Sequence, residues 1–151
     1  YGQGVNIPQK SKIVLVGGGC GIAGLYPLAK KFSKESNVLT LLAAKDKNHL
    51  PYLENFQKYG EVEGVTEDGS LGRKGLVTDL MVDLKEGSYF FNCGPKAMIN
   101  AILPLELKVS APEKVYSSVD YMTRCGVGIC GSCADEKGRR TCIEGPFVSA
   151  N

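Results

Sequence analysis

Lys12-Ile-Val-Leu-Val-Gly-Gly-Gly-Cys-Gly-Ile-Ala-Gly24 is the stretch that decides the fold of this chain. The short, largely apolar run 12–16 predicts a buried strand, and residues 25–32 after the glycine loop 17–24 predict a helix. Strand, glycine loop and helix open a βαβ nucleotide-binding unit, in which loop amides approach a diphosphate at the positive end of the helix. A glycine loop alone is weak evidence, because many strand-to-helix turns contain glycine for steric reasons.

Strands and helices alternate along the rest of the chain. Further strands are predicted at 37–44, 61–66, 88–92 and 114–118. Helices are predicted at 48–58, at 76–84 and around Met98. This alternation indicates an α/β fold with a Rossmann-like parallel sheet flanked by helices, and 151 residues suit one domain with a small appendage.

Two polar segments follow predicted strands, where ligands bind in open α/β sheets. In the loop 67–75, Asp68 and Ser70 offer an acceptor and a hydroxyl, although a mobile surface loop would have the same composition. Residues 45–47, Lys-Asp-Lys, stand where an acid would bind a ribose or a cation an extra phosphate, so NAD and NADP both remain open. A solvated turn is an equal alternative for these three residues. His49, the sole histidine, is interpreted as a surface residue and not a ligand.

Two cysteines lie outside the carboxyl-terminal run. Cys93 follows the strand 88–92, at the mouth of the crevice where a reactive ring would rest. Taken alone, it is more simply explained as a buried structural cysteine. Cys20, inside the glycine loop, is interpreted as a packing residue.

The other four cysteines are Cys125, Cys130, Cys133 and Cys142, with the spacing C-x4-C-x2-C-x8-C. The first three have the spacing with which plant-type ferredoxins hold a [2Fe–2S] cluster. The intervening glycines at 126, 128 and 131 allow positive φ and a close approach of backbone to sulfur. A zinc site usually has two CxxC-like pairs, and a disulfide framework belongs mainly to secreted proteins. The spacing therefore favours iron–sulfur over both alternatives.

Composition excludes several classes of function. The net charge is +2, and the scattered lysines form no basic stripe for nucleic acid. No apolar run approaches the roughly 20 residues of a membrane span, and no signal peptide is evident, so a cytoplasmic protein is expected. Because the sequence opens with Tyr1-Gly-Gln-Gly-Val5, like the middle of a domain, we interpret it as a fragment of a longer protein.

Three motifs together resemble the NAD-binding domain of ferredoxin–NADP-reductase-like flavoproteins. They are Gly17-Gly-Gly-x-Gly-Ile-Ala23, Glu67-Asp-Gly-Ser70 with Lys74-Gly-x-Val-Thr-Asp79, and Cys93-Gly-Pro-x-x-Met98. The cysteine run that follows, ending in Cys142-x-x-Gly-Pro-Phe147, resembles the electron-transfer subunits of dihydroorotate dehydrogenase. The resemblance covers nearly the whole chain.

The resemblance implies three parts: residues 1–10 as the end of, or linker from, a missing FAD-binding barrel, 11–112 as an NAD(H)-binding domain, and 113–151 as a [2Fe–2S] arm. It implies NAD(H) over the glycine loop, with the nicotinamide near Cys93, and a cluster on the four cysteines of the run. The implied nucleotide-binding residues are Gly17, Gly18, Gly19, Gly21, Ile22, Asp68, Gly69, Ser70, Cys93, Gly94, Pro95 and Met98. Electrons would pass between FAD in the full-length protein and an FMN-containing catalytic subunit, in pyrimidine biosynthesis.

Departures from the family pattern keep other assignments open. Gly24 replaces an expected proline, residues 43–45 replace a Gly-x-Arg-like strand end, and the gap before Cys142 is short. The alternatives are the equivalent subunits of an NADH-dependent ferredoxin oxidoreductase, a cytoplasmic hydrogenase or an anaerobic sulfite reductase. An alternative of another class is a zinc-stabilised nucleotide-binding interaction module. No acid–base catalyst is expected in this chain, and residues 124–133 are expected to meet a redox partner.

Overall fold

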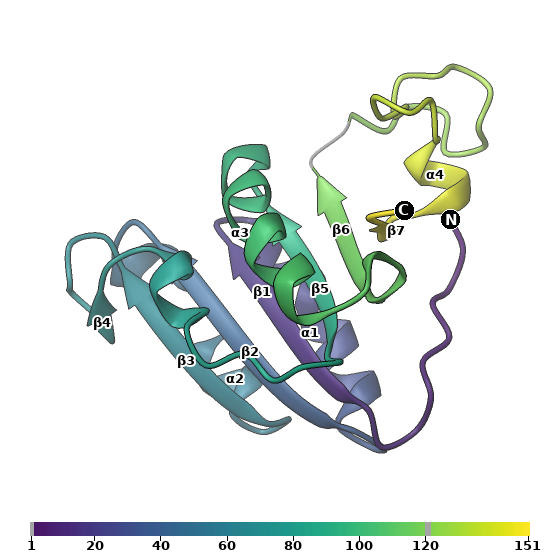
Figure 1. Ribbon diagram of the computed structural model, residues 1–151. Coiled ribbons are helices and arrows are strands. Elements are labelled where there is room, and N and C mark those ends of the chain that lie inside the picture. Colours follow the sequence, from purple (N-terminus) through teal and green to yellow (C-terminus); the bar gives the residue numbers. More distant parts are fainter. Residues whose placement is uncertain (1, 120–121) are drawn as a thin grey trace.

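The computed structural model describes residues 2–119 and 122–151, and within them seven strands form one sheet in the order β4-β3-β2-β1-β5-β6-β7 (Figure 1). The strands are β1 (Lys12–Gly18), β2 (Asn37–Ala44), β3 (Glu61–Thr66), β4 (Arg73–Lys74), β5 (Tyr89–Gly94), β6 (Val115–Val119) and β7 (Val148–Ser149). The helices and 3-10 turns are α1 (Gly21–Phe32), η1 (Lys47–His49), α2 (Leu53–Phe56), η2 (Val77–Leu80), α3 (Lys96–Val109), η3 (Pro112–Lys114) and α4 (Thr141–Glu144).

The sheet is parallel from β4 to β6, and only β7 joins it in the antiparallel sense. β1 lies between β2 and β5, and Gly17 pairs with Leu42 on one side and Cys93 on the other. The carboxyl ends of these three strands therefore meet at one edge of the sheet. The predicted α/β fold with a Rossmann-like parallel sheet is confirmed.

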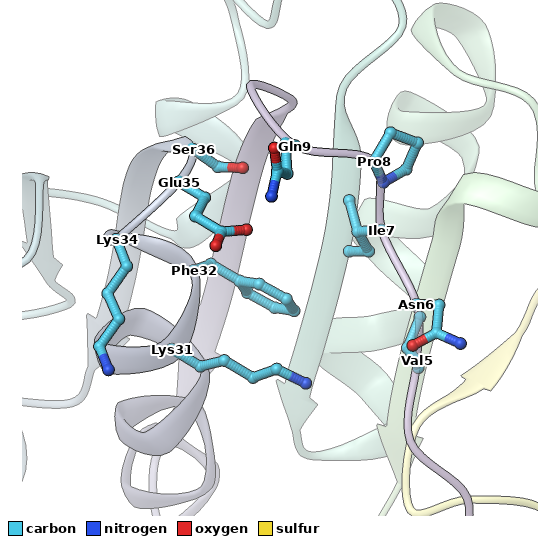
Figure 2. A pocket seen from close by; sticks show the side chains of 10 residues that line it. All are labelled: Val5, Asn6, Ile7, Pro8, Gln9, Lys31, Phe32, Lys34, Glu35 and Ser36. Carbon is cyan, nitrogen blue, oxygen red and sulfur yellow. The ribbon is translucent and has the colours of Figure 1, made fainter.

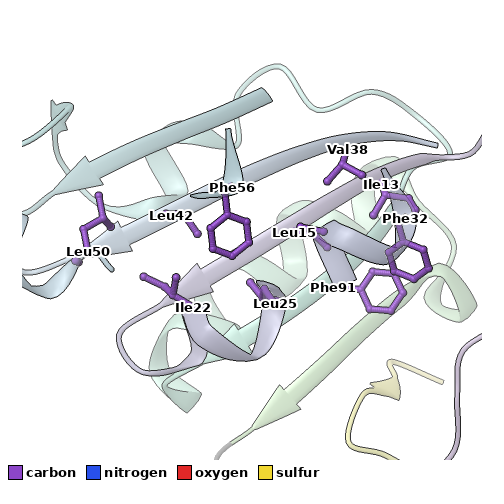
Figure 3. Close-up of a cluster of buried hydrophobic side chains, with 12 residues drawn as sticks. Ile13, Leu15, Ile22, Leu25, Phe32, Val38, Leu42, Leu50, Phe56 and Phe91 are labelled. Carbon is purple, nitrogen blue, oxygen red and sulfur yellow. The ribbon is translucent and has the colours of Figure 1, made fainter. Parts of the chain in front are cut away.

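Hydrophobic side chains are buried on both faces of the sheet, because the connections of a parallel sheet cover both of its faces. Neighbouring residues of β5 show this division, because Phe91 packs with α1 and Phe90 packs with α3. The first cluster, drawn in Figure 3, joins α1 and α2 to the sheet through Leu25 and Phe56, which are fully buried. The second joins η2 and α3 through Val77 and Ile102, among others.

Two predicted helices are wrong. The segment 48–58 forms only the short turns η1 and α2. Between them Pro51 offers no N–H, the preceding Leu50 is non-helical, and Tyr52 has φ 65°.

The segment 76–84 forms only η2, although its apolar spacing is helical. Val77 and Met81 are buried at that spacing, and Leu80 and Leu84 also pack against the core on the α3 face, yet the helical turn ends at Leu80. A segment this short is not helical on its own, and only its first turn is held, by Asp79 Oδ2, which accepts from Leu76 N–H at 2.8 Å.

α1 begins at Gly21, four residues earlier than the predicted helix 25–32. A Cβ added to Gly21 would lie 2.3 Å from the carbonyl oxygen of Cys93. The absence of that atom lets the first turn of the helix pack directly on the end of β5.

The amino-terminal segment runs back along the sheet toward the carboxyl-terminal arm, so that the two ends of the chain lie near each other (Figure 1). Gln3 N–H donates to the carbonyl of Gly145 at 2.7 Å, just beyond α4. Val5 and Ile7 pack against the core cluster on the α1 face. Tyr1, where the predicted linker 1–10 begins, and residues 120–121 of the predicted arm lie outside the described residues. No helix in the described part of the chain is long and apolar enough to cross a bilayer.

Candidate functional site: a nucleotide cavity and a cysteine arm

A cavity of about 490 Å³ opens at the carboxyl edge of the sheet. Its wall comes from the ends of β1, β2 and β3, from the η2 turn and from the start of α3. The lining residues are Gly18, Gly19, Ala43, Ala44, Lys45, His49, Glu67, Gly75, Leu76, Val77, Thr78, Pro95, Ala97, Met98 and Ala101. This edge is where open α/β sheets bind their ligands.

The glycines at this edge let the ends of two strands and a helix come close together. An added Cβ on Gly18 would lie 2.5 Å from Met98 Sδ, and one on Gly94 would lie 2.6 Å from Met98 Cε. Gly19 has φ 56°, and the space around its absent Cβ is open. The loop therefore presents bare backbone to the cavity at Gly19, while Gly18 and Gly94 are required for packing.

The predicted nucleotide-binding residues divide into three groups in the structure. Gly18, Gly19, Pro95 and Met98 line the cavity. A second group belongs to β1, α1 and β5 and does not line the cavity: Gly17, Gly21, Ile22, Cys93 and Gly94. The third group, Asp68, Gly69 and Ser70, lies on the neighbouring loop and is also absent from the cavity lining.

That neighbouring loop uses its polar side chains to hold its own shape. Asp68 Oδ1 accepts a hydrogen bond from Ser70 N–H at 2.9 Å, and Ser70 Oγ accepts one from Lys47 N–H at 2.8 Å. Hydrogen bonds from Ser70 lower the pKa of Asp68 below its usual value. The loop is thereby tied to the η1 turn at the end of β2.

Several cavity residues were not predicted from the sequence. Glu67 and Thr78 belong to the quoted motifs but are not among the predicted binding residues, and Leu76 stands at the variable position of the second motif. His49 is interpreted from the sequence as a surface residue and not a ligand. Its side chain is indeed 66% exposed, yet it lines the cavity. Asp46, a predicted ribose-binding candidate, instead caps η1 by accepting from Asn48 N–H and His49 N–H.

The two cysteines near the glycine loop differ from each other. Cys93 is half-buried, and its Sγ lies 3.3 Å from where a Cβ on Gly24 would stand. The interpretation of Cys20 as a packing residue is wrong, because its side chain is exposed at the amino end of α1.

The four cysteines of the run lie together in the arm as two pairs. Cys125 is hydrogen-bonded through its sulfur to Cys130, whose backbone N–H lies 3.4 Å from Cys125 Sγ. Cys133 and Cys142 form the second pair through their side chains, and both are buried. The structure therefore brings together all four residues predicted to hold a cluster.

Backbone N–H groups of the loop 126–131 point at these sulfurs. Hydrogen bonds from the N–H groups of Cys130 and Val127 lower the pKa of Cys125 to about 6, with a further contribution from Ile129. Gly126, Gly128 and Gly131 have φ between 71° and 75°, a conformation that L side chains rarely adopt. Arg140 Nη1 donates to the Gly128 carbonyl at 2.6 Å and holds this loop against α4. The loop thus stabilises the thiolate of Cys125, whereas the hydrogen bond with Cys133 raises the pKa of Cys142.

The arrangement fits a two-iron cluster better than one zinc ion. A [2Fe–2S] cluster needs two thiolates on each iron, and the four cysteines stand as two pairs. The donor set, the pairing and the inward N–H groups all agree with the cluster.

An ion pair between Lys96, at the start of α3, and Glu136 joins the arm to the sheet domain. Within the arm, Arg139 Nε lies 2.7 Å from Asp135 Oδ2. Arg139 Nη1 also donates to the Ser149 carbonyl in β7 at 2.9 Å. The arm is therefore held beside α3, whose first turns line the cavity at the carboxyl edge.

A second, smaller cavity of about 260 Å³ lies away from this edge, between residues 5–9 and the end of α1. Figure 2 shows Lys31 and Phe32 reaching from the helix toward that segment. Because it adjoins the end of α1 and the start of β1, it lies at the amino edge of the sheet. Ligands of open α/β sheets bind at the opposite edge, so this cavity is not the nucleotide site.

Residues 120–151 match the family described as the iron-sulfur cluster binding domain of dihydroorotate dehydrogenase B. A probable dihydroorotate dehydrogenase B (NAD(+)) electron transfer subunit from Methanocaldococcus jannaschii is 35% identical over 144 residues, covering 92% of this chain and 55% of that protein. The subunit from Caldanaerobacter subterraneus subsp. tengcongensis is 36% identical, covering 99% of this chain and 62% of that protein. The chain is a relative of the dihydroorotate dehydrogenase B electron-transfer subunits.

Solved structures agree with this relationship. A chain of an NADH-dependent reduced ferredoxin-NADP oxidoreductase matches with a TM-score of 0.83 and 29% identity, covering 99% of this chain and 56% of that chain. The ferredoxin reductase of carbazole 1,9a-dioxygenase has a TM-score of 0.62 at 16% identity over 72% of this chain and 37% of that chain, which shows a shared fold alone. This relative of the dihydroorotate dehydrogenase B subunits spans between 55% and 62% of the length of the two curated proteins above.

Proposed function

We propose that the chain binds NAD(H) and a [2Fe–2S] cluster and acts as an electron-transfer subunit, serving dihydroorotate dehydrogenase in pyrimidine biosynthesis. The observation that supports this most is that the cavity and the four paired cysteines are built on one sheet. The cavity at the carboxyl edge has the glycine loop of a dinucleotide site, and the arm has four paired cysteines. The kinship with subunits of that name agrees with the proposal.

In this proposal the protein binds and positions its cofactors and supplies no acid–base catalyst. The bound cluster would supply one-electron transfer, and NAD(H) would supply hydride, with FAD in the full-length protein between them. The glycine loop, with Pro95 and Met98, would hold the diphosphate and nicotinamide half of the nucleotide. The four cysteines of the run would be the cluster ligands, and Arg140 would keep their loop in place.

The proposed division of the chain is 1–10 as a linker, 11–112 as the nucleotide domain and 113–151 as the cluster arm. A flavin domain joined through residues 1–10 would lie beside the arm, because Gln3 is hydrogen-bonded to Gly145. β6 and β7, which flank the cysteine run in the sequence, are strands of the same sheet as β1 to β5 and anchor the arm to it. A cytoplasmic location stays a prediction of the sequence.

The proposed partner is an FMN-containing catalytic subunit that docks over the cluster loop. Met122, Val127 and Ile129 are 65%, 61% and 85% exposed around the cysteines. An electron acceptor must approach the cluster closely, and apolar residues are enriched at the centre of such interfaces. The equivalent subunit of an NADH-dependent ferredoxin oxidoreductase is the second candidate, because a chain of such an enzyme matches over 99% of this one.

The experiment is a measurement of iron, labile sulfide and zinc, with visible and EPR spectra, on anaerobically purified protein. Two irons with sulfide, and a rhombic EPR signal on reduction, are expected. One zinc per chain and no colour would overturn the proposal in favour of a zinc-stabilised nucleotide-binding module.

The proposed NAD(H) site is tested by titrating the protein with NAD+ in a calorimeter. The partner is tested by co-purification with the catalytic subunit, in which Ile129→Asp should abolish binding and the distant Val82→Asp should not.

A further inference from the structure

Near its amino-terminal end, the chain forms a clamp between the carboxyl-terminal arm and the sheet domain. The clamp consists of residues 2–7, and in Figure 1 this purple end of the ribbon runs from beside α4 back along the sheet. Val5 and Ile7 are half-buried and pack against the core cluster on the α1 face. At the other end, Gln3 N–H donates to the carbonyl of Gly145 at 2.7 Å. The clamp therefore contacts both the core and the arm.

The contact with Gly145 is so close that it requires a glycine at position 2. Gly2 has φ 79°, which L side chains rarely adopt, and a Cβ added to it would overlap the carbonyl group of Gly145. Gly4, two residues later, has open space where its Cβ would stand. A side chain at position 2 would therefore push the clamp away from Gly145, whereas a methyl group at position 4 would not.

Gly145 ends the short helix that carries Cys142. It follows α4 directly, and its N–H donates to the carbonyl of Thr141 at 3.0 Å. Cys142 is buried, and its sulfur is hydrogen-bonded to that of Cys133 and accepts a hydrogen bond from Gly128 N–H. The single turn of α4 therefore joins the contact with the clamp to one of the predicted cluster ligands.

The arm beyond Gly145 is fixed by the core. Phe147 packs edge-on against Phe91, with ring centroids 5.6 Å apart and an interplanar angle of 77°. Phe91 is fully buried in the same cluster against which the clamp packs. The cavity of about 260 Å³ beside residues 5–9 interrupts the packing under the clamp, so the hydrogen bond to Gly145 matters for holding it in place. Gly145 is thus held by the core on one side and by the clamp on the other.

We propose that the clamp positions Cys142, with Gly2 and Gln3 as positioning residues that act through Gly145 and α4. The inference rests on the proposed cluster site and gives the amino-terminal segment a role in that site. Because the proposed linker 1–10 includes the clamp, a displacement of the linker would reach the cluster ligand through the contact with Gly145.

The clamp should affect the reduction potential of the cluster as well as its stability. When the clamp is pushed away, α4 shifts and the hydrogen bond from Gly128 N–H to the Cys142 sulfur weakens. Hydrogen bonds to the sulfurs are among the properties that set the potential of an iron–sulfur cluster. Since an N–H donor stabilises the more negative, reduced state, its weakening should make the potential more negative.

The test compares Gly2→Ala with Gly4→Ala in the complete 151-residue chain, purified anaerobically. Gly2→Ala should release iron to a chelator several-fold faster, make the reduction potential more negative and speed up amide hydrogen exchange in residues 142–147. Gly4→Ala should match the wild type in all three measurements, because its Cβ meets open space. Gln3→Ala should also match the wild type, since it keeps the backbone N–H that donates to Gly145.

A second variant loosens the clamp at its other end. Ile7→Ala removes half-buried contacts with the core and should change the same three quantities in the same direction as Gly2→Ala. Gly2 is exposed and lies outside the sheet, so Gly2→Ala does not endanger the fold, and unchanged exchange in β1 to β3 verifies this.

The outcomes separate this inference from the proposed function. The inference is overturned if exchange in residues 142–147, iron release and potential of Gly2→Ala all stay as in the wild type, whether or not the clamp itself loosens. If the wild type takes up no iron and sulfide, the proposed function fails, while exchange in residues 142–147 still decides whether the clamp positions Cys142.

Discussion

A carboxylic acid is buried in the core between α3 and β5, and its protonation should control the stability of the fold. Glu106 and Asn92 are both fully buried, and Asn92 Nδ2 donates to Glu106 Oε2 at 2.7 Å. Among the described residues, Asn92 Oδ1 and Glu106 Oε1 have no hydrogen-bond partner. A proton on Glu106 supplies the donor that these two oxygens lack. Burial raises the pKa of Glu106 from 4.5 to about 7, against a smaller lowering by Asn92.

The sign and size of the effect follow from this pKa. The folded protein holds the proton more tightly than the unfolded chain, so the stabilisation is complete below about pH 4.5 and is lost as the pH rises through 7. With about 1.4 kcal/mol for each pH unit, the full contribution is about 3.5 kcal/mol, of which roughly 2.5 kcal/mol disappears between pH 5 and pH 8.

The assay is urea unfolding at pH 5 and pH 8, followed by circular dichroism, for the wild type and Glu106→Gln. The glutamine cannot ionise, and its amide keeps the hydrogen bond from Asn92 while offering an N–H to Asn92 Oδ1. Its stability should therefore lack the loss of roughly 2.5 kcal/mol that Glu106 causes in the wild type. Glu86→Gln, which removes an exposed carboxylate, should behave as the wild type. Equal losses in the wild type and Glu106→Gln would refute the reasoning.

Three further predictions concern the two sites. Cys130→Ala should remove the iron and the colour of the protein, as measured by metal analysis and absorption, whereas Cys20→Ser should leave both unchanged because Cys20 lies outside the arm. Gly21→Ala should destabilise the chain by about 1–3 kcal/mol in thermal unfolding, because its Cβ would lie 2.3 Å from the Cys93 carbonyl; an unchanged melting temperature would contradict this close packing. Arg140→Ala should speed the loss of the cluster to a chelator several-fold, because it removes the hydrogen bond to the Gly128 carbonyl; Arg140→Lys should recover part of that retention.

Much of the fold could be predicted from short-range patterns. The run at 12–18 and those at 37–44, 61–66 and 89–94 form parallel strands because buried β-branched and apolar residues suit such a sheet. The segments 48–58 and 76–84 were mispredicted because their apolar spacing continues beyond the point where the backbone stops being helical. Pro51 interrupts the first, and in the second the helical turn ends at Leu80 although Leu84 still packs against the core.

The sequence by itself determined the chemistry of the cluster arm, because the spacing of the thiols and the glycines between them can be recognised before the fold is known. It also determined the strand–glycine–helix unit to which the proposal assigns the diphosphate. Only the tertiary structure decided which residues share the cavity. His49 and Leu76 are far apart in sequence and line one cavity because the connections after β2 and β4 both reach the carboxyl edge of the sheet. From the sequence, Asp46 was a candidate ribose ligand. In the structure its carboxylate instead accepts hydrogen bonds from the first N–H groups of the η1 turn, which have no other acceptor within the turn.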